Sequence, residues 1–371
     1  MLLSWPGRLF ALLLLAGLAF FAAPAARAGG PGDSPPSAQA ENQTCLACHS
    51  NRDLSVKLPS GETLSLYTDA NAFNQSVHGQ QGQRCTACHT NISGYPHPPI
   101  AARDARDFSL QMYTLCRQCH NDLYQKTLDS MHAKGLAGGN RNAAVCTDCH
   151  TAHYVTPPDQ PRSKIPQTCQ KCHSAIYAQY KDSVHGTALL DQSNPDVPTC
   201  IDCHGVHNIG DPTTNQFRLY SPQLCAKCHS DQALMRKYNI STNVFNSYVA
   251  DFHGTTVELF AKLSPNQPVN TPVCYDCHGV HDIKSIKDPS SPVYKENLLK
   301  TCQQCHPDAT ANFPSAWMSH YIASPNEYPL VYYVNLFYTI FIPLVLGGMA
   351  GFVVLDMARR IVNRFQKTGR A

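Results

Sequence analysis

The sequence predicts a mainly α-helical chain with extensive irregular structure, followed by one helix near the C-terminus that can cross a membrane. Three observations lead to this fold class. A short motif, CxxCH, recurs along most of the 371 residues. Proline is frequent, with 27 residues, above the average usage of about 5%. A run of 26 residues near the C-terminus carries no formal charge.

CxxCH is the attachment motif of c-type haem, in which two thiols bond to the porphyrin edge and the histidine binds the iron. Nine copies use all eighteen cysteines. The predicted covalent haem ligands are Cys45, Cys48, Cys85, Cys88, Cys116, Cys119, Cys146, Cys149, Cys169, Cys172, Cys200, Cys203, Cys225, Cys228, Cys274, Cys277, Cys302 and Cys305. The predicted proximal iron ligands are His49, His89, His120, His150, His173, His204, His229, His278 and His306. We therefore expect nine c-type haems and no thiol left for a disulfide, an iron–sulfur cluster or a catalytic nucleophile. A zinc-ribbon array, the competing interpretation, would not need a histidine after every second cysteine.

Nine further histidines lie outside the motifs, so each iron can receive a second imidazole. They are His78, His97, His132, His153, His185, His207, His253, His281 and His320, one in each interval between motifs and one after the last. A single spare histidine is more often a surface or core residue, but this even distribution favours distal iron ligation. His97 stands apart in the proline-rich stretch 95–99. The sequence leaves open which spare histidine serves which iron.

Residues 1–28 have the features of a secretory signal peptide. Arg8 precedes an apolar run of 15 residues, and small residues follow at Ala26 and Ala28. The run is shorter than the roughly 20 residues of a spanning helix, which favours a cleaved signal over a retained anchor. Residues 29–44 are rich in Gly, Pro, Ser and Ala and are predicted to be a flexible leader.

Residues 45–327 form the predicted haem domain. The 276 residues from the first motif to the last histidine serve nine haems, too few for an ordinary core around each, so we expect the porphyrins to supply most of the apolar interior. Short helices and irregular loops would wrap them. The internal repeat is two motifs long, near residues 45–97, 116–153, 169–207 and 225–281, with a half repeat at 302–320.

Odd and even motifs differ in the position of the spare histidine. After the third and fifth motifs it lies twelve positions on, and segments 120–132 and 173–185 contain no Pro or Gly, so each can form one helix of roughly 18 Å. After most even motifs it lies three positions on, as His207 follows His204. Two such imidazoles on one helix face cannot bind one iron from opposite sides and are expected to serve two haems. We interpret the repeat as a device that pairs haems.

The doubled pattern, with SxHG between motifs and CxDCHGxH at the second motif, resembles the multihaem cytochromes c of bacterial anaerobic and extracellular respiration, including the pentahaem donors of nitrite reduction. The resemblance covers Cys45 to His320 and implies haem attachment outside a bacterial inner membrane. Catalytic members of that family keep one haem with an open distal site, often with CxxCK, which does not occur here. An electron carrier is therefore expected rather than an enzyme. The alternatives are a multihaem reductase of nitrite, hydroxylamine or tetrathionate and, as a third class, a haem-bearing scaffold.

Residues 328–356 are predicted to be a transmembrane helix, because the uncharged run can cross about 30 Å of hydrocarbon. The basic tail 357–371 suits the cytoplasm, which would leave the haem domain in the periplasm. The stretch from Trp317 to Asn335 resembles the membrane-proximal end of cytochrome c subunits of bacterial quinol-oxidising complexes. This resemblance implies an integral membrane partner, either a b-type cytochrome or a quinone-binding subunit, since the span itself has no histidine for a haem.

The charge distribution argues against a nucleic-acid partner. Without the two arginines of residues 1–28 and the five basic residues after residue 356, the formal charge of +3 becomes −4 for residues 29–356. The expected partners are membrane lipid, the membrane subunit, and a periplasmic or outer-membrane redox protein. The predicted function is electron transfer between the membrane quinone pool and such an acceptor.

Overall fold

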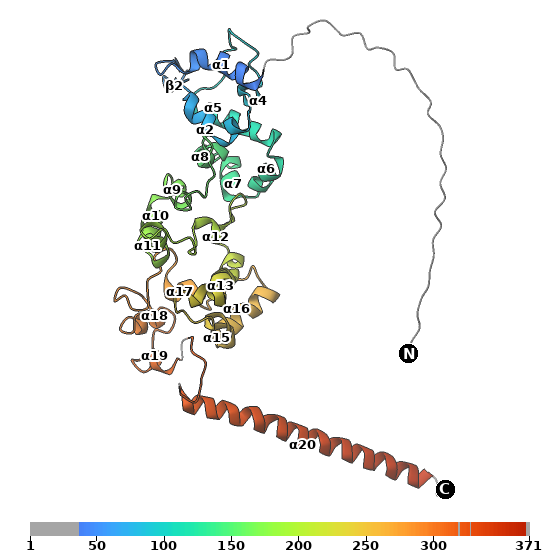
Figure 1. The fold of residues 1–371 in the computed structure, drawn as a ribbon. Helices are drawn as coiled ribbons and strands as arrows, with labels where there is room; N and C mark the ends of the chain where they lie inside the picture. Colours follow the sequence, from blue (N-terminus) through green and yellow to red (C-terminus); the bar gives the residue numbers. More distant parts are fainter. Residues whose placement is uncertain (1–36, 318–319, 327, 369–371) are drawn as a thin grey trace, which may run out of the picture.

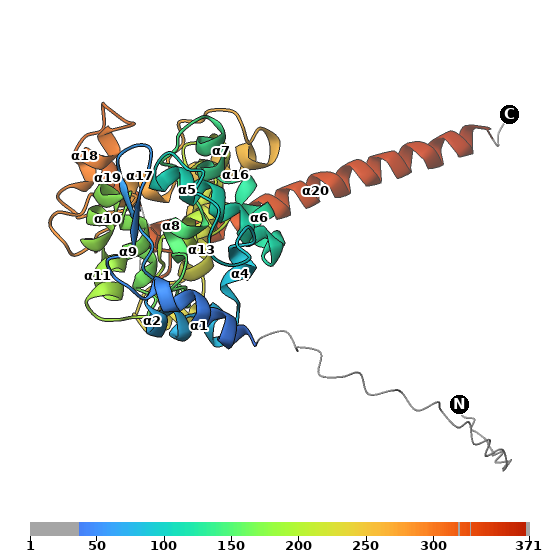
Figure 2. The ribbon, with the colours of Figure 1, turned by 90° about the horizontal axis from the view of Figure 1, so that it is seen from above.

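The computed structural model describes residues 37–317, 320–326 and 328–368. Its short helices follow one another down a column, from α1 (Ala38–His49) at one end to α19 (Phe313–Ala316) at the other (Figure 1). The long helix α20 (Pro329–Thr368) leaves from the end that holds α19 (Figures 1 and 2). The chain thus runs along the column in sequence order. The predicted signal peptide lies outside the described residues.

The predicted fold class is confirmed, because the described residues are mostly helical, with much irregular chain and one short hairpin. The hairpin pairs β1 (Ser55–Lys57) with β2 (Thr63–Ser65) in antiparallel register. The remaining helices are α2 (Ala70–Gln75), α3 (Val77–Gln80), α4 (Cys85–Cys88), α5 (Ala105–Met112), the 3₁₀ helix η1 (Tyr113–Gln118), α6 (Asn121–Leu128), α7 (Met131–Ala137), α8 (Cys146–His150), α9 (Lys164–Gln170), α10 (Ser174–Lys181), α11 (Val184–Leu190), α12 (Cys200–His204), α13 (Asn215–His229), α14 (Gln232–Arg236), α15 (Val244–Ala250), α16 (Phe252–Leu263), α17 (Cys274–His278) and α18 (Leu298–Gln303).

Two expectations differ from the structure near the motifs. Helix α1 begins at Ala38, inside the predicted flexible leader 29–44, because the Ser37 side chain caps it and good helix formers follow. Segments 120–132 and 173–185 are not single helices. Each breaks before its second histidine, where Ser130 and Ser183 cap a new helix.

Three even motifs form five-residue helices of one design. In α8, α12 and α17 the aspartate of CxDCH, three positions after the N-cap residue, accepts a hydrogen bond from that residue's backbone N–H at 2.6–2.7 Å. A cap of this kind is worth about 1 kcal/mol. In the second motif, which has Ala87 in place of the aspartate, Asn42 of α1 accepts instead from Cys85 N–H.

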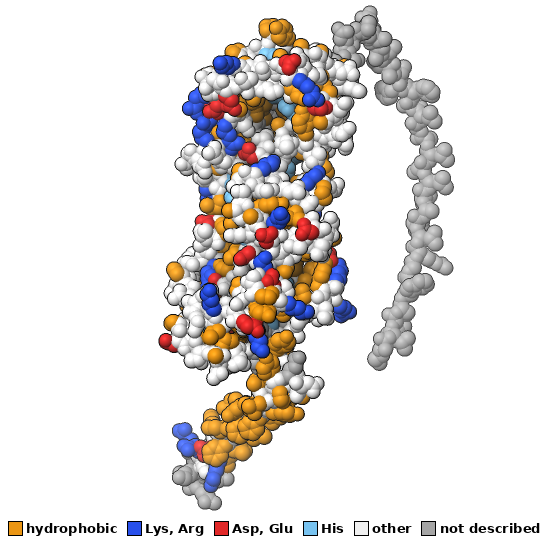
Figure 3. Space-filling view, turned by 90° about the vertical axis from the view of Figure 1, so that its left-hand side faces the viewer, with side chains coloured by type: hydrophobic (Ala, Val, Ile, Leu, Met, Phe, Trp, Pro, Cys, Tyr) orange, Lys and Arg blue, Asp and Glu red, His pale blue; other side chains and the backbone are white. Residues whose placement is uncertain are grey.

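The apolar core is small, as expected. Among the described residues, one buried cluster joins Leu219, Val257 and Val273, and the other buried apolar side chains are scattered along the column. In Figure 3 a few histidine side chains are visible at the surface, and basic and acidic residues are interspersed on the same face. Few buried apolar side chains therefore hold the described part of the column together.

Helix α20 is long and apolar enough to span a membrane. Its stretch Pro329–Arg364 has a mean hydropathy of 2.1 in its most apolar window, none of which is buried against the rest of the chain. A helix of this length exceeds the roughly 30 Å of a hydrocarbon core. The helix continues through the predicted span 328–356 into the basic tail.

Candidate metal centres

Every motif histidine faces one histidine from outside the motifs. All eighteen histidines lie in the described part of the chain, and their ring centres meet at 6.0–6.3 Å in nine separate pairs. The pairs are His49 with His97, His89 with His153, His120 with His78, His150 with His207, His173 with His132, His204 with His281, His229 with His185, His278 with His320, and His306 with His253.

The spacing of the rings fits two imidazoles on opposite sides of one metal ion. With metal–nitrogen bonds of about 2.0 Å and about 1.1 Å from each nitrogen to its ring centre, the centres lie about 6.2 Å apart. Direct stacking or hydrogen bonding would bring the rings closer. Among the described residues, no group of three or more His, Cys, Asp or Glu could hold a metal ion. The histidine pairs are therefore the places where iron can be ligated from two sides.

The pairing follows two interlaced rules. Each even motif faces the spare histidine that follows the next even motif, or, for the eighth motif, the one that follows the ninth. Each odd motif from the third onward faces the spare histidine that follows the preceding odd motif. Only the first departs, because it faces His97. His150 and His153, three residues apart, thus belong to different pairs, as predicted, but they do not share a helix face. Helix α8 ends at His150, and Thr151 after it has a φ of 63°.

In several pairs the surroundings favour the neutral imidazole that binds iron. Burial and a neighbouring imidazole together lower the pKa of His185 and of His278 to about 4. Burial also lowers the pKa of His89, His153 and His204. A metal-binding histidine must give up its proton, so these sites are prepared for ligation near pH 7.

A buried serine places three of the spare histidines. Ser76, Ser130 and Ser183 cap α3, α7 and α11, and the histidine is the second residue of each helix. The residue between serine and histidine donates its backbone N–H to a carbonyl two positions after an even-motif spare histidine. These bonds are Val77 N–H to Val155 O, Met131 N–H to Ile209 O and Val184 N–H to Ile283 O, at 2.8–2.9 Å. Each bond joins the spare-histidine segments of two successive sites.

Glycine follows the spare histidine where two short helices cross closely. A Cβ on Gly79, Gly186 or Gly254 would overlap a backbone carbonyl of the preceding helix, at Phe73, Tyr180 or Tyr248. The glycine of the SxHG pattern is therefore a packing requirement. The third-motif segment has Ala133 at this position, so the requirement depends on how each helix pair crosses.

The cysteines show how consecutive motifs touch. No disulfide joins the eighteen cysteines within the described residues. The helices that carry motifs one and two (α1 and α4), three and four (η1 and α8), five and six (α9 and α12), and seven and eight (α13 and α17) contact each other. Partial burial and the nearby cysteines of the next odd motif raise the pKa of the second cysteine of each even motif. The motifs therefore stand in one file, in sequence order, with two alternating kinds of junction.

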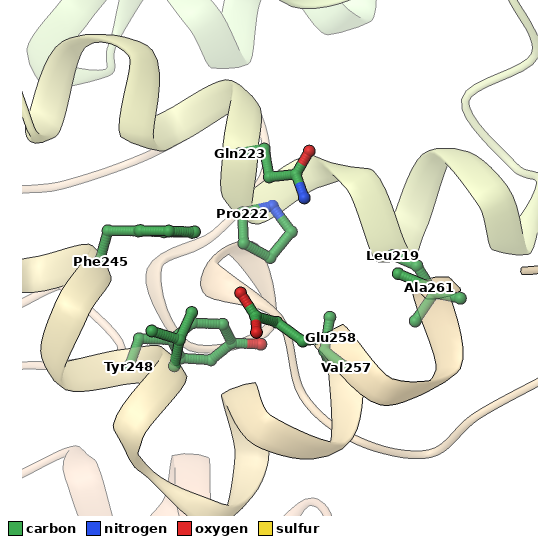
Figure 4. Close-up of a pocket in the computed structure, with 9 residues that line it drawn as sticks. Leu219, Pro222, Gln223, Phe245, Tyr248, Val257, Glu258 and Ala261 are labelled. Atoms are coloured by element: carbon green, nitrogen blue, oxygen red, sulfur yellow. The ribbon is translucent and has the colours of Figure 1, made fainter. Parts of the chain in front are cut away.

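One pocket lies away from the paired histidines. It sits between α13, α15 and α16, where Glu258 points toward Pro222 beside Tyr248 and Phe245 (Figure 4). Its cavity volume of about 10 Å³ leaves room for about one water molecule, far less than the roughly 300–1,000 Å³ of small-molecule sites. Lys262 pairs with the Glu258 carboxylate at 3.7 Å. The pocket contains none of the predicted site residues and extends the small apolar core.

The comparisons with known proteins support a multihaem cytochrome c. A family model described as cytochrome c3 matches residues 140–230. The matched segment contains four of the CxxCH motifs. That segment is therefore similar to cytochrome c3, and the similarity supports c-type haem as the cofactor of a multihaem electron-transfer cytochrome. No significant match to the chain was found among curated proteins or solved structures.

Sequence reasoning missed the order of the histidine pairs and a set of arginines. The partners in each pair are 41 to 77 residues apart, so the spacing of neighbouring residues cannot predict which histidines pair. Arg106, Arg162 and Arg218 each bind the aspartate of an even motif. The sequence does contain a pattern that could have identified these arginines, because each lies seven or ten residues before the first cysteine of an odd motif.

Proposed function

We propose that this chain is a membrane-anchored electron-transfer cytochrome with nine c-type haems, each attached through one CxxCH motif and ligated by one of the nine histidine pairs. The observation that carries the proposal is the complete matching of motif and spare histidines at 6.0–6.3 Å. A c-type haem supplies a one-electron iron couple. The distal ligands are then assigned pair by pair.

The histidine pairs favour a carrier over a reductase. A reductase needs one iron with an open or displaceable position for its substrate. Each pair presents a ring to both sides of its site, and burial lowers the pKa of His89, His185, His204 and His278, which favours the unprotonated imidazole. The chain's own side chains would thereby exclude water and small anions from every iron.

The arrangement of neighbouring motifs supports a continuous path. Helix contacts join motifs one and two, three and four, five and six, and seven and eight, and the second cysteine of each even motif lies near the cysteines of the next odd motif. Attachment through neighbouring thiols would keep the edges of successive haems close, which electron tunnelling requires. Electrons would enter or leave at the two ends of the file.

Helix α20 supports attachment to a membrane at one end of the file. It leaves the column beside α18 and α19, next to the ninth motif (Figure 1). Because the span has no histidine, electrons would come from a separate integral membrane subunit, a b-type cytochrome or quinone-binding protein. The column would stand in the periplasm of a bacterial inner membrane and deliver to a periplasmic or outer-membrane acceptor.

Mass analysis and ligand binding test the haem assignment. The mature chain should carry nine attached haems, and its magnetic spectra should show only low-spin, six-coordinate iron. Carbon monoxide should leave the reduced Soret band unchanged. A shift of that band in the wild-type protein would reveal a labile iron position and favour the reductase.

Reconstitution tests the membrane role. The detergent-extracted native protein should copurify with an integral membrane subunit, and the complex in vesicles should reduce the haems with a quinol. Reduction by quinol without any partner subunit would contradict the proposed division of labour.

A further inference from the structure

We propose that Arg106, Arg162 and Arg218 are positioning residues that hold the two haem-attachment motifs of a couple in register. The inference rests on the proposed haem ligation and adds a determinant of haem–haem geometry. A couple means motifs one and two, three and four, five and six, or seven and eight, each defined by contact between the two helices that carry its motifs.

The arginines share one geometry. Each lies shortly before or within the helical run that ends in an odd motif, and its guanidinium pairs with the aspartate of the following even motif. The three pairs are Arg106 with Asp148 at 3.0 Å, Arg162 with Asp202 at 2.6 Å and Arg218 with Asp276 at 2.8 Å. Each arginine also donates to a backbone carbonyl just before the even motif. The guanidinium thus binds both the aspartate of the even motif and the backbone just before that motif.

The aspartate connects this contact to the haem-attachment cysteine. The same carboxylate accepts the N–H of the residue immediately before the first cysteine, as Asp202 does from Thr199. Thr199 is buried, and Cys200 follows it at the start of α12, which contacts α9, the helix that carries Cys169 of the odd motif. Guanidinium, carboxylate and the residue before the even-motif cysteine therefore form one short connection between the two motifs. An arginine suits this role because its planar fork can bind a carboxylate and a carbonyl together.

The first couple makes the same connection with its charges reversed. Glu41 of α1 precedes the odd motif and pairs with Arg84, which directly precedes the even motif, at 3.3 Å. Glu41 also hydrogen-bonds Thr86, and Asn42 accepts from Cys85 N–H. The contact between the two motifs thus recurs with different residues. A surface ion pair that arose incidentally would not recur at the same place in all four couples.

The exposure of the arginines separates them from an ordinary surface arginine. The side chains of Arg106, Arg162 and Arg218 are 22%, 32% and 23% exposed, whereas Arg103, which pairs with Asp107, is 74% exposed. Arg103 and Asp107 are four residues apart in one segment of the chain. Arg103 therefore offers a matched control, an arginine–aspartate pair that connects no two motifs.

The test uses the full-length haem-loaded chain in detergent with five variants: Arg162→Ala, Arg162→Lys, Asp202→Asn, the double variant Arg162→Ala with Asp202→Asn, and Arg103→Ala. Asparagine retains a cap acceptor but removes the charge. Soret circular dichroism reports the distance and orientation of coupled haems, and mass spectrometry of haem peptides reports attachment at each motif.

Arg162→Ala and Asp202→Asn should each reduce the excitonic Soret signal, by up to one quarter because one of four couples is altered. The double variant should lose no more than the larger single effect, Arg162→Lys should lose less, and Arg103→Ala should match the wild type. Haem loss confined to the fifth and sixth motifs would support the same conclusion.

A wild-type Soret signal in Arg162→Ala would overturn the inference, as would additive losses in the double variant or haem loss spread over all motifs. The proposed function has a separate readout, the haem count of the unaltered chain. Nine haems with an unaffected Arg162→Ala spectrum would reject only the positioning role.

Discussion

Replacing Gly186 with alanine should destabilise the chain although alanine is the better helix former. Gly186 lies in α11 directly after His185, and a new Cβ would overlap the carbonyl of Tyr180 and the Cα of Lys181. Alanine gains about 1 kcal/mol over glycine in a helix, whereas overpacking against backbone costs about 1–3 kcal/mol. Because backbone cannot rotate away as a side-chain end can, we expect the upper part of that range and a net loss of about 1–2 kcal/mol.

A loss of this size lowers the midpoint of thermal unfolding by about 2–8 °C in a domain of this length. The assay is thermal unfolding followed by far-ultraviolet circular dichroism. The displaced α11 should also move His185 away from His229, so a share of one iron in nine should become high-spin. Gly210→Ala serves as the control, because nothing lies within 4 Å of its added Cβ. An unchanged or higher midpoint in Gly186→Ala, with fully low-spin iron, would refute the packing argument.

Three further changes have defined outcomes. His207→Ala should open one iron and allow one carbon monoxide per chain, because His207 faces only His150 while His204 keeps His281; zero or two would contradict the pairing. Asp107→Asn should lower the thermal midpoint above about pH 4 and match the wild type near pH 2. Hydrogen bonding to Arg103 lowers the pKa of Asp107 to about 2, so the stabilisation from its carboxylate is lost as the pH falls through that value. Thermal unfolding scans across pH 2–7 measure this. Truncation after residue 327 should make the chain soluble without detergent and leave its haem count unchanged, since no part of the most apolar window of α20 is buried. Aggregation seen by sedimentation, or haem loss seen by mass analysis, would indicate that α20 packs on the column.

The sequence predicted what depends on composition and spacing. The scarcity of an apolar core follows from the number of residues per motif, and α20 follows from a long uncharged run. The separation of His150 from His153 into two pairs was predicted from their short spacing, although the predicted shared helix face does not form because α8 ends at His150. These properties are local, so one stretch of chain contains all the information they need.

The sequence could not predict what depends on the path of the chain between motifs. His207 could face any iron within reach, and the choice of His150 is made by contacts such as Met131 N–H with Ile209 O. The break before His132 was missed for a related reason. Ser130 lies in a segment with helical composition, where serine is only a weak helix former. Its side chain can instead cap a new helix, and this capping competes with continuation of the first helix.

The interlaced pairing changes the meaning of the cytochrome c3 match. Residues 140–230 contain the motif histidines His150, His173, His204 and His229, yet only His150 and His229 find their partners inside that segment. The other two face His132 and His281, beyond its two ends. A family model can therefore recognise a repeating pattern of attachment motifs without marking a unit that completes its own iron sites. Dividing the chain between any two couples separates one histidine pair of an even motif and one of an odd motif. The smallest stretch in which every histidine has its partner is therefore the whole file of motifs. The couples are expected to fold and take up haem together rather than as independent domains.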